Sequence, residues 1–383
     1  MFGISSARGR GQPDVLKTRS DLAWPVALLV TLLVYVRFSF ARGESFSYDF
    51  ANYQTYLLAL KEVEWATLME FLPLTFPYVF VPGGGAFELG FAAITKWLLL
   101  ALPPSAVYAL VAAASVGLRT FAMRRLGLEW GWLAAIQIYA ITLFEANALR
   151  AGVALSITLW ALLMLRDRRW MLAMLGAVAA ASQHMQVVLF VGPFALLLLT
   201  PQRWLRVRWL PLLVLGVSGL ATVMAAGLLG GLDVSKLDDY SGESSGAVGL
   251  NLVSALSTVF VAFAVWVSLG PQREPVSASD ASGRQAERIW VCALYAALPA
   301  LALLLFGTEL SAIGDRAWQF ALVILVTLST PMGRSGVGRW LRCSMLGLIL
   351  AVALTNTLVR YPLSNFFSPP LPYERIVPLW LVR

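Results

Sequence analysis

The stretch that decides the fold is LRAGVALSITLWALLMLRDRR, residues 149–169. Its apolar run, 151–165, lies between Arg150 on one side and a basic cluster at 166–169 on the other. A helix rises about 1.5 Å per residue, so repeated runs of this kind approach the hydrocarbon core of a bilayer, which is roughly 30 Å thick. Basic loops next to such runs favour the cytoplasmic side. The stretch therefore predicts a membrane helix with Arg150 at its outer end.

Composition extends this prediction to the whole chain of 383 residues. Hydrophobic residues make up 59% of it and charged residues 13%, whereas an ordinary soluble domain has about 25% charged residues. A soluble protein of this size could not hide so much apolar surface. The sequence predicts an all-α, polytopic integral membrane protein with about eleven or twelve helical segments, some of them short or re-entrant on the outer side. The apolar runs fall at about 22–40, 86–102, 105–122, 130–146, 151–165, 171–200, 209–231, 249–270, 289–308, 317–331 and 343–359.

The same counts exclude several function classes. One histidine and two cysteines, Cys292 and Cys343, are too few for a Cys/His zinc site or a disulfide framework, and we expect neither a metal nor a cofactor. The net charge of +8 does not indicate nucleic acid, because 25 of the 29 basic residues are Arg and they cluster beside apolar runs. That distribution is typical of membrane orientation.

The charges between the apolar runs predict the orientation and the domains. A basic N-terminal tail, 1–21, stays in the cytoplasm and precedes a retained first span at 22–40, since no cleavable signal is visible. A single membrane domain is expected over 22–359, followed by an outer tail over 360–383. Along this domain, basic loops alternate with acidic or mixed loops, as the preference of basic loops for the cytoplasm requires.

The first outer region, 43–103, is predicted to make no net crossing of the membrane. The basic loop at Arg124 must lie inside, so the span before it must start outside. Two arrangements satisfy this parity: 71–82 and 86–102 form a re-entrant hairpin, or 86–102 lies along the outer surface. Lys96, within an otherwise apolar helix, fits either arrangement better than a lipid-exposed span.

The long run 171–200 predicts a break rather than one continuous helix. It contains the polar pentad Ser182-Gln183-His184-Met185-Gln186 near its middle, which would be costly at the middle of the bilayer. We therefore expect two short helices that meet at His184 near one surface, with Pro193 in the second helix.

The candidate functional residues all fall on the outer side of this map. Ionisable groups are scarce in the chain, so their convergence on one side is a functional hypothesis. Arg150 and Arg316 offer planar forks for phosphate, an Asp or His could take a proton from a sugar hydroxyl, and tyrosines could stack on sugars. The candidates are Asp49, Tyr53, Glu88, Glu145, Arg150, His184, Tyr240, Arg316 and Tyr373.

Each candidate also has a structural interpretation. Arg150 at a helix end could place its charge among lipid head groups, and Arg316 could pair locally with Asp315. A lone histidine in a helix break, such as His184, is often a hydrogen-bonding group of the fold. Tyr53 could belong to the aromatic belt at the membrane surface. The functional interpretation therefore depends on whether these side chains converge.

The order of several short motifs resembles the EpsG family, the Wzy-type polymerases of bacterial exopolysaccharide and O-antigen. The motifs are Tyr48-Asp49…Tyr53, Phe87-Glu88-Leu89-Gly90-Phe91, Leu149-Arg150-Ala151, Ala-Ala-Ser-Gln-His184, Asp315-Arg316…Phe320 and Leu371-Pro372-Tyr373. The chain departs from the family pattern beside three of these residues. Tyr48 replaces a Thr before the Asp, Ala151 replaces a Gln after the Arg, Gln183 replaces a Phe before the His, and Met185-Gln186 replace small residues after it.

The resemblance implies an enzyme of the bacterial inner membrane with a cytoplasmic N-terminus. It would polymerise oligosaccharide repeat units linked to undecaprenyl pyrophosphate at the outer face, without a metal or cofactor. A flippase and a chain-length regulator of the same pathway are the expected partners. The implied catalytic residues are Asp49, Arg150 and His184. The implied substrate-binding residues are Tyr53, Glu88, Tyr240, Arg316 and Tyr373.

The sequence leaves two alternative functions open. One is a transporter or flippase of lipid-linked sugars, which would be expected to have polar groups near the middle of the bilayer and inverted repeats; neither is evident in the sequence. The other is a non-catalytic assembly component of the polysaccharide machinery, in which the outer Arg and His residues are structural.

Overall fold

The computed structural model describes most of the chain around the candidate residues. The described residues are 50–69, 78–81, 85–145, 148–205, 210, 213–220, 281–306, 311–328, 344 and 347. Asp49, Tyr240 and Tyr373 lie outside them, as do the predicted spans 22–40 and 249–270 and both predicted tails.

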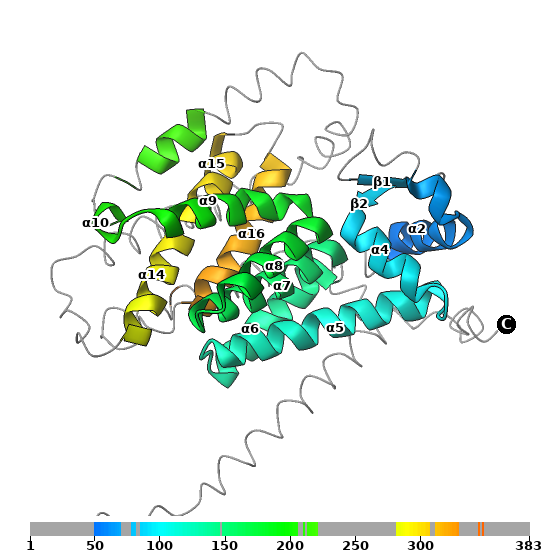
Figure 1. Cartoon of the computed structure of the whole chain (residues 1–383), viewed down its shortest axis with the longest axis horizontal. Coiled ribbons are helices and arrows are strands. Elements are labelled where there is room, and N and C mark those ends of the chain that lie inside the picture. The colour runs from blue at the N-terminus through cyan, green and yellow to red at the C-terminus, as the bar shows by residue number, and fades with distance from the viewer. Residues whose placement is uncertain are drawn as a thin grey trace, which may run out of the picture.

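The described chain is mainly helical, with one small sheet (Figure 1). The α-helices are α2 (Phe50–Glu62), α4 (Leu89–Leu98), α5 (Pro104–Arg125), α6 (Trp130–Ala140), α7 (Leu149–Arg166), α8 (Trp170–Gln183), α9 (Val188–Leu199), α10 (Gln202–Leu205), α14 (Ala281–Ala296), α15 (Leu298–Phe306) and α16 (Ser311–Leu328). A π-helical turn, Ile141–Glu145, follows α6, and a 3-10 turn, Met185–Val187, precedes α9. Strands β1 (Tyr78–Val81) and β2 (Gly85–Glu88) pair in antiparallel fashion. The all-α class is confirmed, and the sheet is an addition to it.

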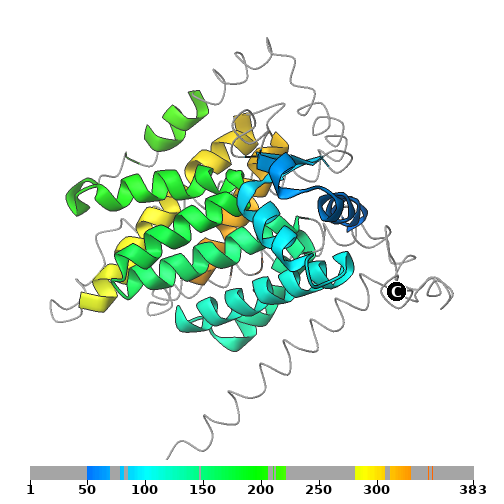
Figure 2. The same cartoon turned by 45° about the vertical axis from the view of Figure 1, so that its right-hand side comes forward.

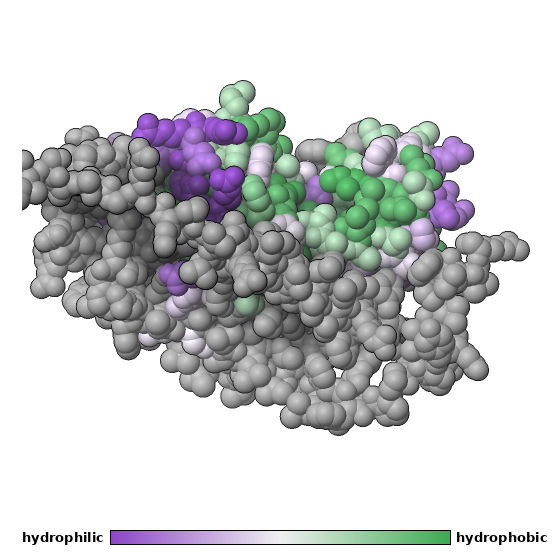
Figure 3. Space-filling view, turned by 90° about the horizontal axis from the view of Figure 1, so that it is seen from below, coloured by the Kyte–Doolittle hydropathy of each residue, from purple (hydrophilic) through white to green (hydrophobic). Residues whose placement is uncertain are grey.

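Within the described residues, three helical segments are long and apolar enough to cross a membrane. They are Pro104–Arg125, Leu149–Arg166 and Gln285–Leu304, the last running from α14 into α15. The shorter α8 presents exposed hydrophobic side chains such as Met171 and Val178, as expected of a surface that faces lipid. Among the described residues that Figure 3 shows in colour, hydrophobic side chains form broad patches, with hydrophilic residues gathered at the left and at the right of them.

Several of these helices keep their basic ends together. Arg166, at the end of α7, donates a hydrogen bond to the carbonyl of Arg125, where α5 ends. Gln285 of α14 donates to the carbonyl of Leu165 at 2.9 Å, and Arg288 follows less than one turn later. We call this side of the bundle, marked by Arg125, Arg166 and Arg288, the basic end. The preference of basic residues for the cytoplasm predicts such a grouping.

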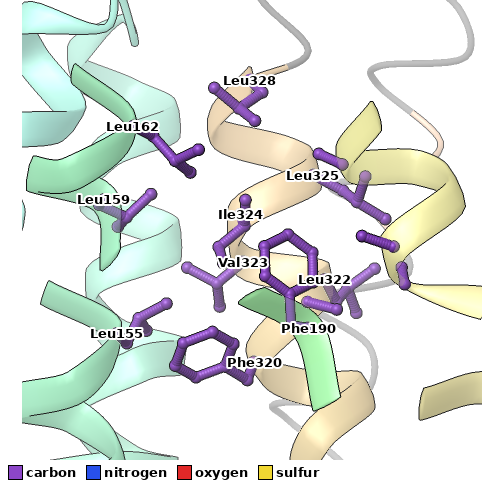
Figure 4. Packing of buried hydrophobic residues seen from close by; sticks show 14 of the residues in the cluster. Leu155, Leu159, Leu162, Phe190, Phe320, Leu322, Val323, Ile324, Leu325 and Leu328 are labelled. Carbon is purple, nitrogen blue, oxygen red and sulfur yellow. The ribbon is translucent and has the colours of Figure 1, made fainter. Parts of the chain in front are cut away.

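The opposite end holds the starts of α7 and α16. Figure 4 shows residues 155–162 of α7 beside 320–328 of α16, with the two helices running in the same direction. The side chains between them are buried hydrophobics of the main core. Because Arg150 and Arg316 precede these residues in their helices, both lie towards the end of the bundle away from the basic end.

The helix predicted over 86–102 is shorter than expected. Residues 85–88 form strand β2 instead, in a register that sets Tyr78 of β1 opposite Glu88, and α4 begins only at Leu89. Figures 1 and 2 show this hairpin, α2 and α4 gathered beside the ends of α5 and α8. The buried aromatic residues of the group pack with α5 in a second hydrophobic cluster.

Lys96 is a charged residue within the apolar helix α4, and its contacts explain why it is tolerated there. Its side chain is buried, and Nζ donates to the carbonyls of Leu60 and Lys61 at 2.8 and 3.1 Å, and to that of Val63. The C-terminal end of a helix bears partial negative charge, which a cation stabilises. The ammonium group therefore caps α2 and ties it to α4 instead of facing lipid.

Candidate functional site

Four elements meet at the end of the bundle opposite the basic end. α2 supplies Tyr53, β2 supplies Glu88, the first turn of α7 supplies Arg150, and the break between α8 and α9 supplies His184. The contacts between them join residues 62 to 97 positions apart in the sequence. We call these four residues the polar cluster. Each is a separate candidate in the sequence, and the structure brings them together.

Arg150 lies at the centre of the polar cluster. Its Nη1 donates to Oε2 of Glu88, and its guanidinium carbon lies 4.3 Å from the centre of the Phe87 ring. Its backbone N and its Nε lie 3.3 and 3.4 Å from the Tyr53 hydroxyl. The side chain is 21% exposed, and Nη2 has no hydrogen-bond partner among the described residues. Arg150 is thus held by protein groups, with one donor nitrogen left over.

His184 occupies the helix break that the polar pentad predicts. α8 ends at Gln183, and the backbone of His184 is extended, with φ −159° and ψ 109°, before the 3-10 turn. Its Nδ1 lies 3.1 Å from Oε1 of Glu88, and its Nε2 lies 3.0 Å from Oε1 of Gln186. The backbone N–H of Met185 donates to the same Glu88 oxygen at 3.3 Å. The break therefore directs both a ring nitrogen and a backbone donor at one carboxylate.

Glu88 connects the two basic side chains of the cluster. Its side chain is only 3% exposed. Burial raises the pKa of Glu88, but the hydrogen bond with His184 and the charge of Arg150 outweigh it and lower the pKa to about 2. The carboxylate is therefore ionised at neutral pH. The carboxylate only accepts, so Nδ1 carries the proton in this contact. Nε2 faces the side-chain amide of Gln186, which presents its oxygen here and would present its NH2 group if the amide were turned over.

Gly90 allows α4 to start against the end of α8. A Cβ atom at this position would lie 2.3 Å from Oγ and 2.7 Å from the carbonyl oxygen of Ser182. Any side chain here would push the start of α4 away from α8. Because Glu88 precedes Gly90 by two residues and His184 follows Ser182 by two, this close approach sets the contact between Glu88 and His184.

A second ion pair, between Arg119 and Glu145, lies inside the bundle. Nη1 and Nη2 of Arg119 donate to the two oxygens of Glu145 at 2.7 and 2.8 Å, and both side chains are 0% exposed. Nε of Arg119 donates to Gln137, and Ser115 donates to Glu145, each at 2.8 Å. The hydroxyl of Tyr108 donates to the backbone carbonyl of Glu145 at 2.6 Å. Protein groups thus surround this pair on several sides.

This pair corrects the expectation for Glu145. Its side chain binds Arg119 of α5 instead of joining the polar cluster, because the π-helical turn Ile141–Glu145 changes the direction of residues at the end of α6. Arg119 is the residue that sequence reasoning missed. Its one signal is that it is a lone Arg inside the apolar run 105–122.

The remaining candidates are not members of the polar cluster. α16 begins at Ser311, so Arg316 lies in the second turn of the helix instead of at its predicted start. Arg316 is partly buried, and because it precedes Phe320 in α16 it lies towards the same end of the bundle as the polar cluster. Asp49 directly precedes α2, and it lies outside the described residues together with Tyr240 and Tyr373.

The polar cluster combines an anion-binding group with an acid–base pair. Nη2 of Arg150 can donate to a phosphate oxygen. His184, held at Nδ1 by Glu88, can exchange a proton at Nε2 when a substrate displaces Gln186 from it. No group of three or more His, Cys, Asp or Glu that could hold a metal ion occurs among the described residues. The arrangement suits a phosphate-bearing substrate bound beside a general base.

The sequence matches the model of the EpsG family over residues 26–368. No curated protein and no solved structure shows a significant match. The family match covers nearly the whole chain and confirms the resemblance that the motifs around the polar cluster indicate. The chain therefore belongs to the EpsG family and is a membrane protein of polysaccharide biosynthesis.

Proposed function

We propose that the protein polymerises oligosaccharide repeat units linked to polyprenyl pyrophosphate, at the outer face of the bacterial inner membrane. The contact of Glu88 with both Arg150 and His184 is the observation that supports this most directly. It sets a phosphate-binding guanidinium beside an imidazole oriented by a carboxylate. Transfer from a pyrophosphate-linked sugar requires both: a donor for the leaving group and a base for the acceptor hydroxyl.

The distribution of charge supports an outer position for the polar cluster. Arg125 and Arg166 meet at the basic end, which we assign to the cytoplasm because basic loops are retained there. The polar cluster lies at the opposite end of the same helices. Lipid-linked repeat units would therefore reach it from the outer leaflet, and the N-terminus would be cytoplasmic.

The proposed reaction forms one glycosidic bond and breaks one sugar–phosphate bond. When the substrate displaces Gln186 from His184, Nε2 accepts the proton of an acceptor sugar hydroxyl, whose oxygen attacks the anomeric carbon of the growing chain. The bond from that carbon to the pyrophosphate oxygen breaks, and polyprenyl pyrophosphate leaves with the electron pair. Nη2 of Arg150 donates to the leaving anion and stabilises its charge as it develops. In this scheme Asp49 is the alternative proton acceptor, and Arg316 is a second cation for the pyrophosphate.

A transporter of lipid-linked sugars is the second candidate function, and the buried pair of Arg119 and Glu145 is the feature that raises it. Ionisable groups inside membrane helices often mark a path for a substrate or for protons. Both side chains are 0% exposed, however, and they bind each other, Gln137 and Ser115. A pair enclosed in this way offers no face to a substrate, so polymerisation is the better supported function.

The test follows lipid-linked repeat units in cells that produce the polysaccharide. We expect His184→Gln and Arg150→Lys to keep normal membrane abundance and to accumulate unpolymerised repeat units at the outer face. Arg169→Lys, at an exposed residue near the basic end, is the matched control and should give wild-type polymer. Accumulation at the cytoplasmic face would indicate transport and contradict the proposal. Wild-type polymer from both variants would contradict it as well.

A further inference from the structure

Tyr56 is buried in the hydrophobic cluster next to the polar cluster, and its hydroxyl has no partner in the part of the chain that the structure describes. It follows Tyr53 by three residues on α2, so the two phenols lie on neighbouring positions of one helix face. Its side chain is 0% exposed, and its hydroxyl makes no hydrogen bond with the described residues. A buried polar group without a partner reduces stability, so each one in a native protein calls for an explanation.

The surroundings of Tyr56 differ from those of other unpartnered groups. Nε1 of Trp290 and Nε1 of Trp318 also lack partners, but both belong to the main hydrophobic core, which contains no member of the polar cluster. Tyr56 belongs to the second hydrophobic cluster, which includes Tyr53. Nε2 of Gln54 on α2 also lacks a partner among the described residues, but that residue is only partly buried and is not part of this cluster. The Tyr56 hydroxyl is therefore the one to examine for a ligand.

The ring of Tyr56 packs on the same side chain as Arg150 does. Its centre lies 3.5 Å from the centre of the Phe87 ring, and the guanidinium carbon of Arg150 lies 4.3 Å from that same centre. Burial raises the pKa of Tyr56, the charge of Arg150 lowers it, and the charge of Glu88 raises it. Both charges therefore act on this phenol, which keeps its proton at neutral pH and is a hydrogen-bond donor.

We propose that the Tyr56 hydroxyl is a further substrate-binding group, which donates a hydrogen bond to an oxygen of the pyrophosphate that Nη2 of Arg150 also binds. This inference rests on the proposed function. Two donors beside the Phe87 ring, both without partners among the described residues, fit a ligand that is rich in acceptor oxygens, as a pyrophosphate is. Because Glu88 already compensates the charge of Arg150, a neutral phenol adds a hydrogen bond without burying another cation.

The test separates stability from binding in the full chain purified in detergent. Tyr56→Phe removes an unpartnered hydroxyl, so we expect the unfolding temperature to stay the same or rise. We expect its affinity for undecaprenyl pyrophosphate to fall by about tenfold to a hundredfold, as for the loss of a hydrogen bond to a charged group. Tyr295→Phe is the matched control, because Tyr295 donates to the carbonyl of Leu205 at 2.9 Å in another part of the bundle. It should lower the unfolding temperature and leave the affinity unchanged.

Inorganic pyrophosphate is the second probe. A similar fractional loss of affinity for this probe in Tyr56→Phe supports a contact with the pyrophosphate itself, and a loss confined to the lipid-linked form overturns that contact. Wild-type affinity of Tyr56→Phe for both probes overturns the inference, as does a lower unfolding temperature, which would reveal an internal partner. If Arg150→Ala abolishes binding while Tyr56→Phe binds normally, only this inference fails. If the wild-type protein binds neither probe, the proposed function fails.

Discussion

Arg119 with Glu145 and Arg150 with Glu88 are two ion pairs of the same residue types, and both contact the first turns of α7. The first pair is bidentate, both side chains are 0% exposed, and Gln137 also binds the Arg. In the second pair the Arg uses one terminal nitrogen for Glu88, is 21% exposed, and keeps Nη2 without a partner among the described residues. The carboxylate of this second pair also binds a histidine.

This difference teaches how to tell a structural ion pair from a functional one in a membrane protein. An ionisable residue inside the bilayer is by default a functional hypothesis, and Arg119 and Arg150 meet that criterion equally well in the sequence. The two arginines can be told apart only in the structure, by counting the hydrogen bonds that each guanidinium makes. In the pair of Arg119 and Glu145, which we call the enclosed pair, the guanidinium nitrogens all bind protein groups. In the pair of Arg150 and Glu88, the open pair, one guanidinium nitrogen has no partner among the described residues, and His184 lies beside the carboxylate.

Breaking the enclosed pair should have the largest effect. Arg119→Ala leaves the Glu145 carboxylate buried without its partner, which costs about 3–5 kcal/mol of stability. We expect the variant to be depleted from membranes and to unfold at a lower temperature in detergent. The double variant Arg119→Met, Glu145→Leu should restore abundance and polymer output, because apolar residues can replace a buried pair. Restored abundance without polymer would assign a function to the enclosed pair and remove the contrast.

Changing the open pair should lower turnover and leave abundance normal. A hydrogen bond to a charged group is worth roughly 1.5–3 kcal/mol, so Arg150→Ala should reduce polymerisation on the order of tenfold to a few hundredfold. Arg150→Lys keeps the charge but loses the planar fork, and we expect an intermediate loss. Polymer length and rate are measured in membranes with equal amounts of protein. Wild-type chain lengths from the Lys variant would favour a head-group role for Arg150.

Displacing the support of the open pair should have a smaller effect. Gly90→Ala forces α4 away from α8, at a cost of about 1–3 kcal/mol for overpacking, and should reduce polymerisation by loosening Glu88 from His184. Gly117→Ala is the matched control, because no atom lies within 4 Å of a Cβ at that position. It should be neutral or slightly stabilising. Thermal unfolding and polymer yield check both variants, and equal behaviour of the two would refute the role of Gly90.

The smallest effect is a dependence of stability on pH. The pKa of Glu88 is lowered from 4.5 to about 2. The contribution of the Glu88 carboxylate to the free energy of unfolding is therefore present above roughly pH 4.5 and is lost as the pH falls towards 2. Between pH 4.5 and 3.5 the wild-type protein should lose about 1 kcal/mol more stability than Glu88→Gln. Unfolding of both proteins in detergent at the two pH values measures this difference. Parallel losses would show that Glu88 is not stabilised as a carboxylate.

The sequence predicted the helices better than the contacts between them. α7 and the break at His184 follow from the length of an apolar run and from the cost of polar residues at depth, which are local properties. The residue types of Tyr53, Glu88, Arg150 and His184 were enough to select them one by one. The same reasoning failed at 85–88, where strand pairing with β1 replaces the first turn of the expected helix.

The pairings could not be predicted, because they depend on packing between distant segments. Glu88 reaches His184, 96 positions away, only because Gly90 lets α4 lie against α8. Glu145 was expected in the outer site because nothing in the sequence relates it to Arg119. Tyr56 gave no signal at all, since a tyrosine in an apolar helix becomes informative only when its hydroxyl proves to have no partner.

Lys96 has a consequence for building chimaeras between members of the family. Its ammonium group binds the carbonyls that end α2, so a residue of α4 helps to determine where the helix bearing Tyr53 stops. Residues 50–98 are therefore one exchangeable block. A crossover within the block would join the end of one parent's α2 to another parent's α4. Where that α4 has no lysine at the position of Lys96, three carbonyls would be left without their cation. A crossover in the turn before α5 would transfer the capped helix, the hairpin and Glu88 together.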